Sequence, residues 1–174
     1  MRRRYYWVTI LSCMIWSGLP GCGNPDNSGE PTPELRRLRI AEWEGVLARY
    51  RGKYVVIDTW ATWCGPCVKE FPKLVKLHHK YRDRDVVVLG VSIDDPQYEP
   101  QAREFLRKQQ ADFPNFLIAY DDWVQRWQIT AIPLVLVLDQ EGKLLRRFDR
   151  GAPGSPFTYE DVDRFLSQLL QAKN

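Results

Sequence analysis

Residues 58–67 read Asp-Thr-Trp-Ala-Thr-Trp-Cys-Gly-Pro-Cys, and they place Cys64 and Cys67 between an apolar segment and a helical one. Residues 53–60 are almost continuously apolar and rich in β-branched side chains, which predicts a strand covered on both faces. From residue 66 to residue 81 apolar side chains recur with a helical period, and Pro72 is expected to kink this helix. Both thiols therefore lie at a helix N-terminus, where free N–H groups and the helix dipole stabilise an anion.

The spacing of the two cysteines predicts a reversible dithiol–disulfide pair. In a Cys-x-x-Cys helix start the first thiol is the more exposed one, so we expect Cys64 to attack a disulfide and Cys67 to resolve the mixed disulfide. A zinc site would need more ligands, and His78 and His79 lie about 16–18 Å farther along the helix. A purely structural disulfide would close too small a ring to add much stability. We expect neither a metal nor a cofactor, and we interpret His78 as a packing residue and His79 as a surface residue.

Two acidic residues are candidates for proton transfer at this pair. Asp58 falls in the middle of the predicted buried strand, where an unpaired carboxylate is costly. A carboxyl with a raised pKa can take the proton from Cys67; the alternative is an acid at the solvated end of the strand. Glu70 follows Cys67 by three residues on the same helix face, and its alternative role is to stabilise the helix start through the dipole. We predict catalytic roles for Asp58 and Glu70.

A proline at the start of a later strand is a candidate for substrate binding. Thr130-Ala-Ile-Pro133 precedes a strongly apolar run, and proline at a strand's first residue cannot donate to the sheet. A cis bond before Pro133 would leave the backbone of Ile132 free to pair with an extended peptide, and the sequence does not decide between cis and trans. The predicted substrate-binding residues are Trp63, Gly65, Pro66, Ile132 and Pro133.

Along the rest of the chain, strands alternate with helices. Apolar periodicity predicts helices at residues 43–50, 102–109, 121–127 and 162–170, strands at residues 85–93 and 115–118, and a hairpin at residues 133–149. This order predicts an α/β fold, a three-layer sandwich with a mixed central sheet. The acidic pairs at strand ends and helix starts are interpreted as turn and cap residues rather than metal ligands: Asp94-Asp95 and Asp121-Asp122.

The beginning of the chain has the features of an export signal. Three arginines at residues 2–4 precede the apolar residues 7–19, a stretch shorter than the roughly 20 residues that a spanning helix needs. Leu19-Pro20-Gly21-Cys22 resembles a bacterial lipobox, although Pro20 departs from the usual small residue. We expect a lipoprotein-type signal peptide at residues 1–21, with an uncleaved anchor or ordinary signal cleavage as alternatives.

Residues 22–34 are expected to be a lipidated Cys22 followed by a flexible tether, because residues 23–34 contain three prolines and no large apolar side chain. Residues 35–174 then form the folded domain, which we expect to be monomeric. Cys13 leaves with the signal, so Cys64 and Cys67 remain without an odd thiol. From Cys22 onward 22 basic residues balance 22 acidic ones, which gives little electrostatic reason to expect nucleic-acid binding.

The string Trp63-Cys-Gly-Pro-Cys-Val-Lys-Glu-Phe-Pro-Lys-Leu74, with Ile132-Pro133 downstream, resembles the thioredoxin family and, within it, the membrane-anchored TlpA/ResA-like branch. The resemblance covers roughly residues 40–170 and implies a thioredoxin-like fold. It implies that Asp58 matches the buried acid of thioredoxins, Glu70 the active-site glutamate of the branch and Pro133 the cis-proline. Residues 96–116 look like the extra strand–helix insertion of this branch, whereas residues 41–51 predict a helix where the branch usually has a β-hairpin.

The function expected from these residues and this resemblance is thiol–disulfide exchange outside the cytoplasm. We expect a lipid-tethered enzyme on the periplasmic side that reduces protein disulfides, with a membrane electron donor regenerating its dithiol. A peroxiredoxin-like peroxidase is an alternative, but it would need Thr and Pro before a lone cysteine, and Ala61-Thr62-Trp63 stands here. A copper-delivering or disulfide-holding module is another alternative; it would use Cys-x-x-x-Cys with a distal His or Met, and residues 22–174 contain no Met.

Overall fold

The computed structural model describes residues 34–150 and 157–172, which belong to one compact unit spanning Pro31–Asn174. The signal peptide, the lipidated Cys22 and the tether expected in residues 1–33 lie outside the described residues. Within residues 34–150 and 157–172, no helix is both long and apolar enough to cross a membrane.

A six-stranded sheet in the order β1-β4-β3-β2-β5-β6 forms the middle layer. The sheet is mixed, as the sequence predicts. Strands β1, β4, β3 and β2 run parallel, whereas β5 is antiparallel to both β2 and β6. The strands are β1 (Leu35–Arg37), β2 (Tyr54–Trp60), β3 (Val86–Ser92), β4 (Asn115–Leu117), β5 (Leu134–Leu138) and β6 (Leu144–Asp149).

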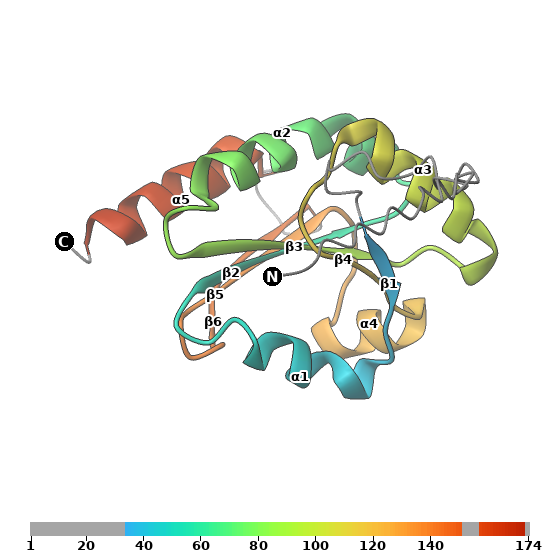
Figure 1. Ribbon diagram of the computed structural model, residues 1–174, viewed down its shortest axis with the longest axis horizontal. Helices are drawn as coiled ribbons and strands as arrows, with labels where there is room; N and C mark the ends of the chain where they lie inside the picture. The colour runs from blue at the N-terminus through green and yellow to red at the C-terminus, as the bar shows by residue number, and fades with distance from the viewer. Residues whose placement is uncertain (1–33, 151–156, 173–174) are drawn as a thin grey trace, which may run out of the picture. The chain divides into compact units, whose positions relative to one another are not determined.

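Helices cover both faces of this sheet (Figure 1). Helices α2, α3 and α5 lie on one face, and α1 and α4 lie on the opposite face. The helices are α1 (Trp43–Ala48), α2 (Gly65–Tyr81), α3 (Glu99–Gln109), α4 (Tyr120–Trp127) and α5 (Tyr159–Gln171), with short 3-10 turns at Ile40–Glu42 and Pro96–Tyr98. The three-layer α/β sandwich expected from the alternation of strands and helices is confirmed.

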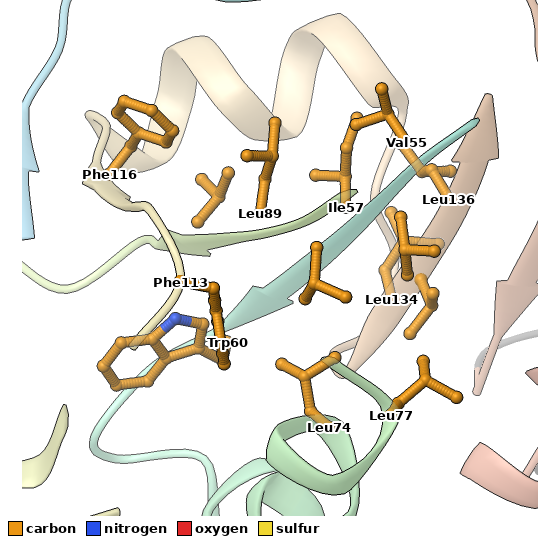
Figure 2. Packing of buried hydrophobic residues seen from close by; sticks show 14 of the residues in the cluster. Val55, Ile57, Trp60, Leu74, Leu77, Leu89, Phe113, Phe116, Leu134 and Leu136 are labelled. Atoms are coloured by element: carbon orange, nitrogen blue, oxygen red, sulfur yellow. The ribbon is translucent and has the colours of Figure 1, made fainter. Parts of the chain in front are cut away.

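Strand β2 is the centre of the core, because all seven of its residues are buried. Its side chains alternate between the two helical layers, as pleating requires. Trp60 points toward α2, where its ring meets Phe71 at a centroid distance of 5.2 Å. Thr59 points the other way and accepts a 2.9 Å hydrogen bond from the indole of Trp123 in α4. Figure 2 shows this division, with Leu74 of α2 below the sheet near Trp60 and with Leu89 above it.

Two details of the fold differ from the sequence predictions. Strand β1 was not expected, because Leu35-Arg-Arg37 carries two charged side chains; its parallel pairing with β4 at the sheet edge makes it a strand. The expectation that Asp121 caps α4 is wrong: the N-cap is Ala119, and Asp121 lies in the first turn. Pro72 lies inside α2 (Gly65–Tyr81), and the kink expected there stays a prediction.

Candidate active site

Cys64 and Cys67 form a disulfide at the start of α2, with their Cα atoms 5.2 Å apart. Cys64 is the N-cap of this helix, and its Sγ accepts a 3.2 Å hydrogen bond from the backbone N–H of Cys67. Pro66 occupies the first turn, where no backbone donor is needed. Cys64 keeps 5% of its surface and Cys67 only 1%, so the order of exposure is the one that the predicted roles require.

The loop before the cysteines is held by Asp94, which follows β3 and is 1% exposed. Its carboxylate accepts hydrogen bonds from the Thr62 backbone N–H at 3.0 Å and from the Thr62 hydroxyl at 2.6 Å. The Ser92 hydroxyl donates a third bond at 2.8 Å. From the sequence, Asp94 is expected to be a turn residue, and this role in holding the loop is not predicted. An acid directly after a run of buried strand residues was the available signal, since such a carboxylate needs several donors.

Asp58 lies in β2 as predicted, fully buried on the face of the sheet that α2 and α5 cover. Its Oδ1 accepts a 2.6 Å hydrogen bond from the hydroxyl of Tyr159, the first residue of α5, and its Oδ2 has no hydrogen-bond partner among the described residues. Burial raises the pKa of Asp58 to about 7, and the bond from Tyr159 opposes this rise. Burial, reinforced by the nearby Asp58, raises the pKa of Tyr159 well above its usual value, so Tyr159 stays a donor.

Glu70 lies one helical turn beyond Cys67 and is partly exposed. Lys73 pairs with Glu70 at 2.9 Å and with Glu160 of α5 at 3.2 Å, so this lysine links the two helices. The charge of Glu70 also reaches Tyr159, where it adds to the raised pKa that burial causes. Sequence reasoning missed Tyr159 because it lies 101 residues from Asp58.

The predicted substrate-binding residues surround the sulfur of Cys64. The bond between Ile132 and Pro133 is cis, and the Ile132 carbonyl oxygen lies 3.8 Å from Cys64 Sγ. Trp63, Gly65 and Pro66 are exposed. Beside Cys64, a shallow hollow of about 200 Å³ has mainly apolar walls that include Trp63, Tyr120, Val124, Ile129 and Ile132. Such a surface can receive an extended, partly apolar segment of another protein.

Comparisons with known proteins agree with this geometry. The sequence model of the AhpC/TSA family matches residues 29–154. The thiol-disulfide oxidoreductase ResA of Geobacillus kaustophilus is 26% identical over 141 residues, which cover 81% of this chain and 77% of that protein. ResA of Bacillus cereus is 25% identical over 178 residues and covers 97% of this chain and 99% of its own.

A solved structure extends the likeness to the fold. The thioredoxin domain of a thiol-disulfide oxidoreductase from Bacteroides vulgatus superposes with a TM-score of 0.56 at 27% identity, over 68% of this chain and 83% of that domain. The strands and helices that position the cysteine pair are therefore a known scaffold for thiol chemistry.

Proposed function

Because this chain belongs to the AhpC/TSA family, we propose that its Cys64–Cys67 pair reduces disulfide bonds of other proteins. The chain is a thiol–disulfide oxidoreductase, as its relatives are named. The observation that carries the proposal is the disulfide at the start of α2, together with the buried acid Asp58 in β2, the strand that precedes this helix in the chain. The two thiols hold both electrons, so the reaction needs no further cofactor.

In the first step, the thiolate of reduced Cys64 attacks a substrate disulfide and releases one substrate thiolate. The N–H of Cys67 and the start of α2 stabilise negative charge on Cys64. In the second step, Cys67 loses its proton, attacks the Sγ of Cys64 and releases the second substrate thiolate. Two electrons pass from the dithiol to the substrate, and the enzyme keeps the Cys64–Cys67 disulfide.

Asp58 is the proposed acceptor of the Cys67 proton. Its Oδ2 has no partner among the described residues, and a pKa of about 7 suits a group that takes and returns a proton near neutral pH. Glu70, at the exposed edge beside Lys73, is proposed to exchange this proton with solvent. The fixed bond from Tyr159 to Oδ1 leaves Oδ2 for the proton.

The substrate is proposed to lie along the hollow beside Cys64. Exposed Trp63 supplies an apolar contact, and the backbone of Ile132 can pair with an extended chain next to the sulfur. Gly65 and Pro66 carry little side-chain bulk in front of the pair, which favours a large substrate. Pro133 directly precedes β5 and follows Ile132, so it is placed beside the proposed substrate path.

We place this reaction outside the cytoplasm on the strength of the first 22 residues. The basic start, the short apolar stretch and Cys22 support a lipid anchor, and a membrane electron donor would regenerate the dithiol of a monomeric enzyme. Mass spectrometry of the purified N-terminus tests the anchor. An acylated Cys22 supports it, whereas an intact start at Met1 or Arg2 in membranes means that the segment is not cleaved.

Insulin reduction by two cysteine variants tests the reaction. Cys64→Ser is expected to abolish reduction, whereas Cys67→Ser is expected to attack and trap the substrate as a mixed disulfide, because only resolution is lost. The two variants are matched, since each removes one sulfur of the same disulfide. Equal trapping by both would contradict the assigned roles. If the protein does not reduce insulin, turnover of peroxide would instead support a peroxidase. Saturable copper binding at Cys64 would instead support a copper-delivering module.

A further inference from the structure

Three potential metal ligands converge near the C-terminal end of α2, away from the cysteines. His78 and His79 belong to the last turns of this helix, and Asp112 lies in the loop between α3 and β4. The ligand atoms of the three side chains all lie within 4.8 Å of one another. About 16 Å of helix separates this group from Cys67, so the group is not part of the proposed active site.

The two nitrogen–oxygen distances to Asp112 are close to those of a tetrahedral metal site. The Nε2 atom of His78 lies 3.4 Å from Oδ1 of Asp112, and Nε2 of His79 lies 3.8 Å from the same oxygen. Ligands bound to zinc at about 2.0–2.2 Å are about 3.3–3.5 Å apart in a tetrahedron. The first pair therefore already fits. The second needs a shift of a few tenths of an ångström, which a small rotation of the exposed His79 ring supplies.

Oδ1 of Asp112, the oxygen that both histidines approach, is buried and accepts no hydrogen bond within the described ranges that would compensate for its burial. A buried carboxylate oxygen without a donor is costly, and a cation between it and the two imidazoles would remove that cost.

One cation already contacts the cluster from its outer side. Nη1 of Arg82 lies 3.5 Å from Oδ2 of Asp112 and 3.4 Å from Nδ1 of His79, while its Nε lies 3.9 Å from exposed Asp83. Arg82 thus contacts Oδ2 of Asp112, whereas the two histidines approach Oδ1 of the same carboxylate. Its positive charge lowers the affinity for a metal, and its half-exposed side chain can turn toward Asp83 and solvent.

We propose that His78 Nε2, His79 Nε2 and Asp112 Oδ1 bind one divalent transition metal ion, zinc in particular. Two imidazoles and one carboxylate suit zinc better than calcium or magnesium, which prefer oxygen ligands alone. Water would complete the tetrahedron, because the histidine side is partly open. The ion would join the end of α2 to the loop before β4 and so stabilise the folded state by mass action. It takes no part in disulfide exchange.

Zinc titration of the full chain in detergent tests this site. The Cys64–Cys67 disulfide is kept oxidised and the remaining thiols are alkylated, so that no sulfur can bind zinc. Calorimetry is expected to give one ion per chain with micromolar affinity and a melting temperature that rises with zinc. His78→Gln, His79→Gln and Asp112→Asn are each expected to weaken binding at least tenfold and to remove the thermal shift.

Two neighbouring substitutions serve as controls. Asp83→Asn removes an exposed acid outside the cluster and is expected to leave zinc affinity unchanged. Arg82→Ala removes the competing cation and is expected to tighten binding. His79 is exposed, so its variant remains a valid test even if a variant at His78 fails to fold. Absence of saturable binding, or equal binding by wild type and all three ligand variants, would overturn the proposal. Insulin reduction is expected to stay unchanged in His79→Gln, which separates this test from that of the proposed function.

Discussion

Replacement of Asp58 by Asn tests the buried acid, because the structure predicts both the sign and the pH range of the effect. The pKa of Asp58 rises from 3.8 to about 7 on folding because burial penalises its charge. Between these two values the folded protein binds a proton that the unfolded chain does not. The folded wild type therefore loses stability as the pH rises from about 4 to about 7, by up to about 4 kcal/mol.

The asparagine variant has no such titration, so its stability relative to wild type changes with pH. Its side-chain oxygen can still accept the bond from Tyr159. Its amide nitrogen replaces Oδ2, which has no partner among the described residues, and this unmet donor costs about 1–3 kcal/mol. Near pH 4 the protonated acid has a similar unmet hydroxyl, so we expect nearly equal stability. At pH 8 we therefore expect Asp58→Asn to be more stable by up to about 4 kcal/mol.

Urea unfolding of the oxidised proteins at pH 5 and at pH 8 measures this difference. Asp95→Asn, which removes an exposed acid, is the matched control and is expected to show little difference between the two pH values. Insulin reduction near neutral pH is expected to slow in Asp58→Asn, since the proton acceptor of Cys67 is gone. A stability difference that is the same at both pH values would refute the burial argument, and an unchanged rate would refute the catalytic role.

Three further substitutions test contacts that only the folded chain makes. Tyr159→Phe removes the donor that lowers the pKa of the buried carboxyl, so the pH–rate profile of insulin reduction should move to higher pH and stability should fall by about 1–2 kcal/mol; an unmoved profile would contradict this. Asp94→Asn replaces a carboxylate oxygen by an NH₂ group that cannot accept a hydrogen bond from Thr62. This change should lower the free energy of unfolding in urea by about 1–3 kcal/mol and slow insulin reduction. A wild-type rate of insulin reduction would contradict the idea that Asp94 positions the loop before the cysteines. Gly90→Ala places a Cβ 1.9 Å from Oδ1 of Asn115, so the melting temperature should drop by an amount that corresponds to about 1–3 kcal/mol. An unchanged melting temperature would show that the Asn115 side chain can move away without cost.

The sequence by itself determined the features that are encoded over short distances. The seven buried residues of β2 and the amphipathic α5 follow from apolar periods that are visible within one element. The cysteine pair at the start of α2 follows from a strand, a turn and a proline that are adjacent in the chain. The alternation of these elements was enough to predict the layers and the mixed sheet.

Only the tertiary structure decided which distant side chains complete each site. Tyr159 meets Asp58 across 101 residues, and Asp94 reaches Thr62 across 32 residues, because the sheet order and the packing of α5 bring them together. Strand β1 exists because β4 offers it a partner, although its own sequence has little strand character. Asp112 likewise comes close to His78 and His79 only in the folded chain, and this proximity forms the proposed zinc site. Local periodicity reports which face of an element is buried, whereas the partner on that face depends on how the whole chain packs.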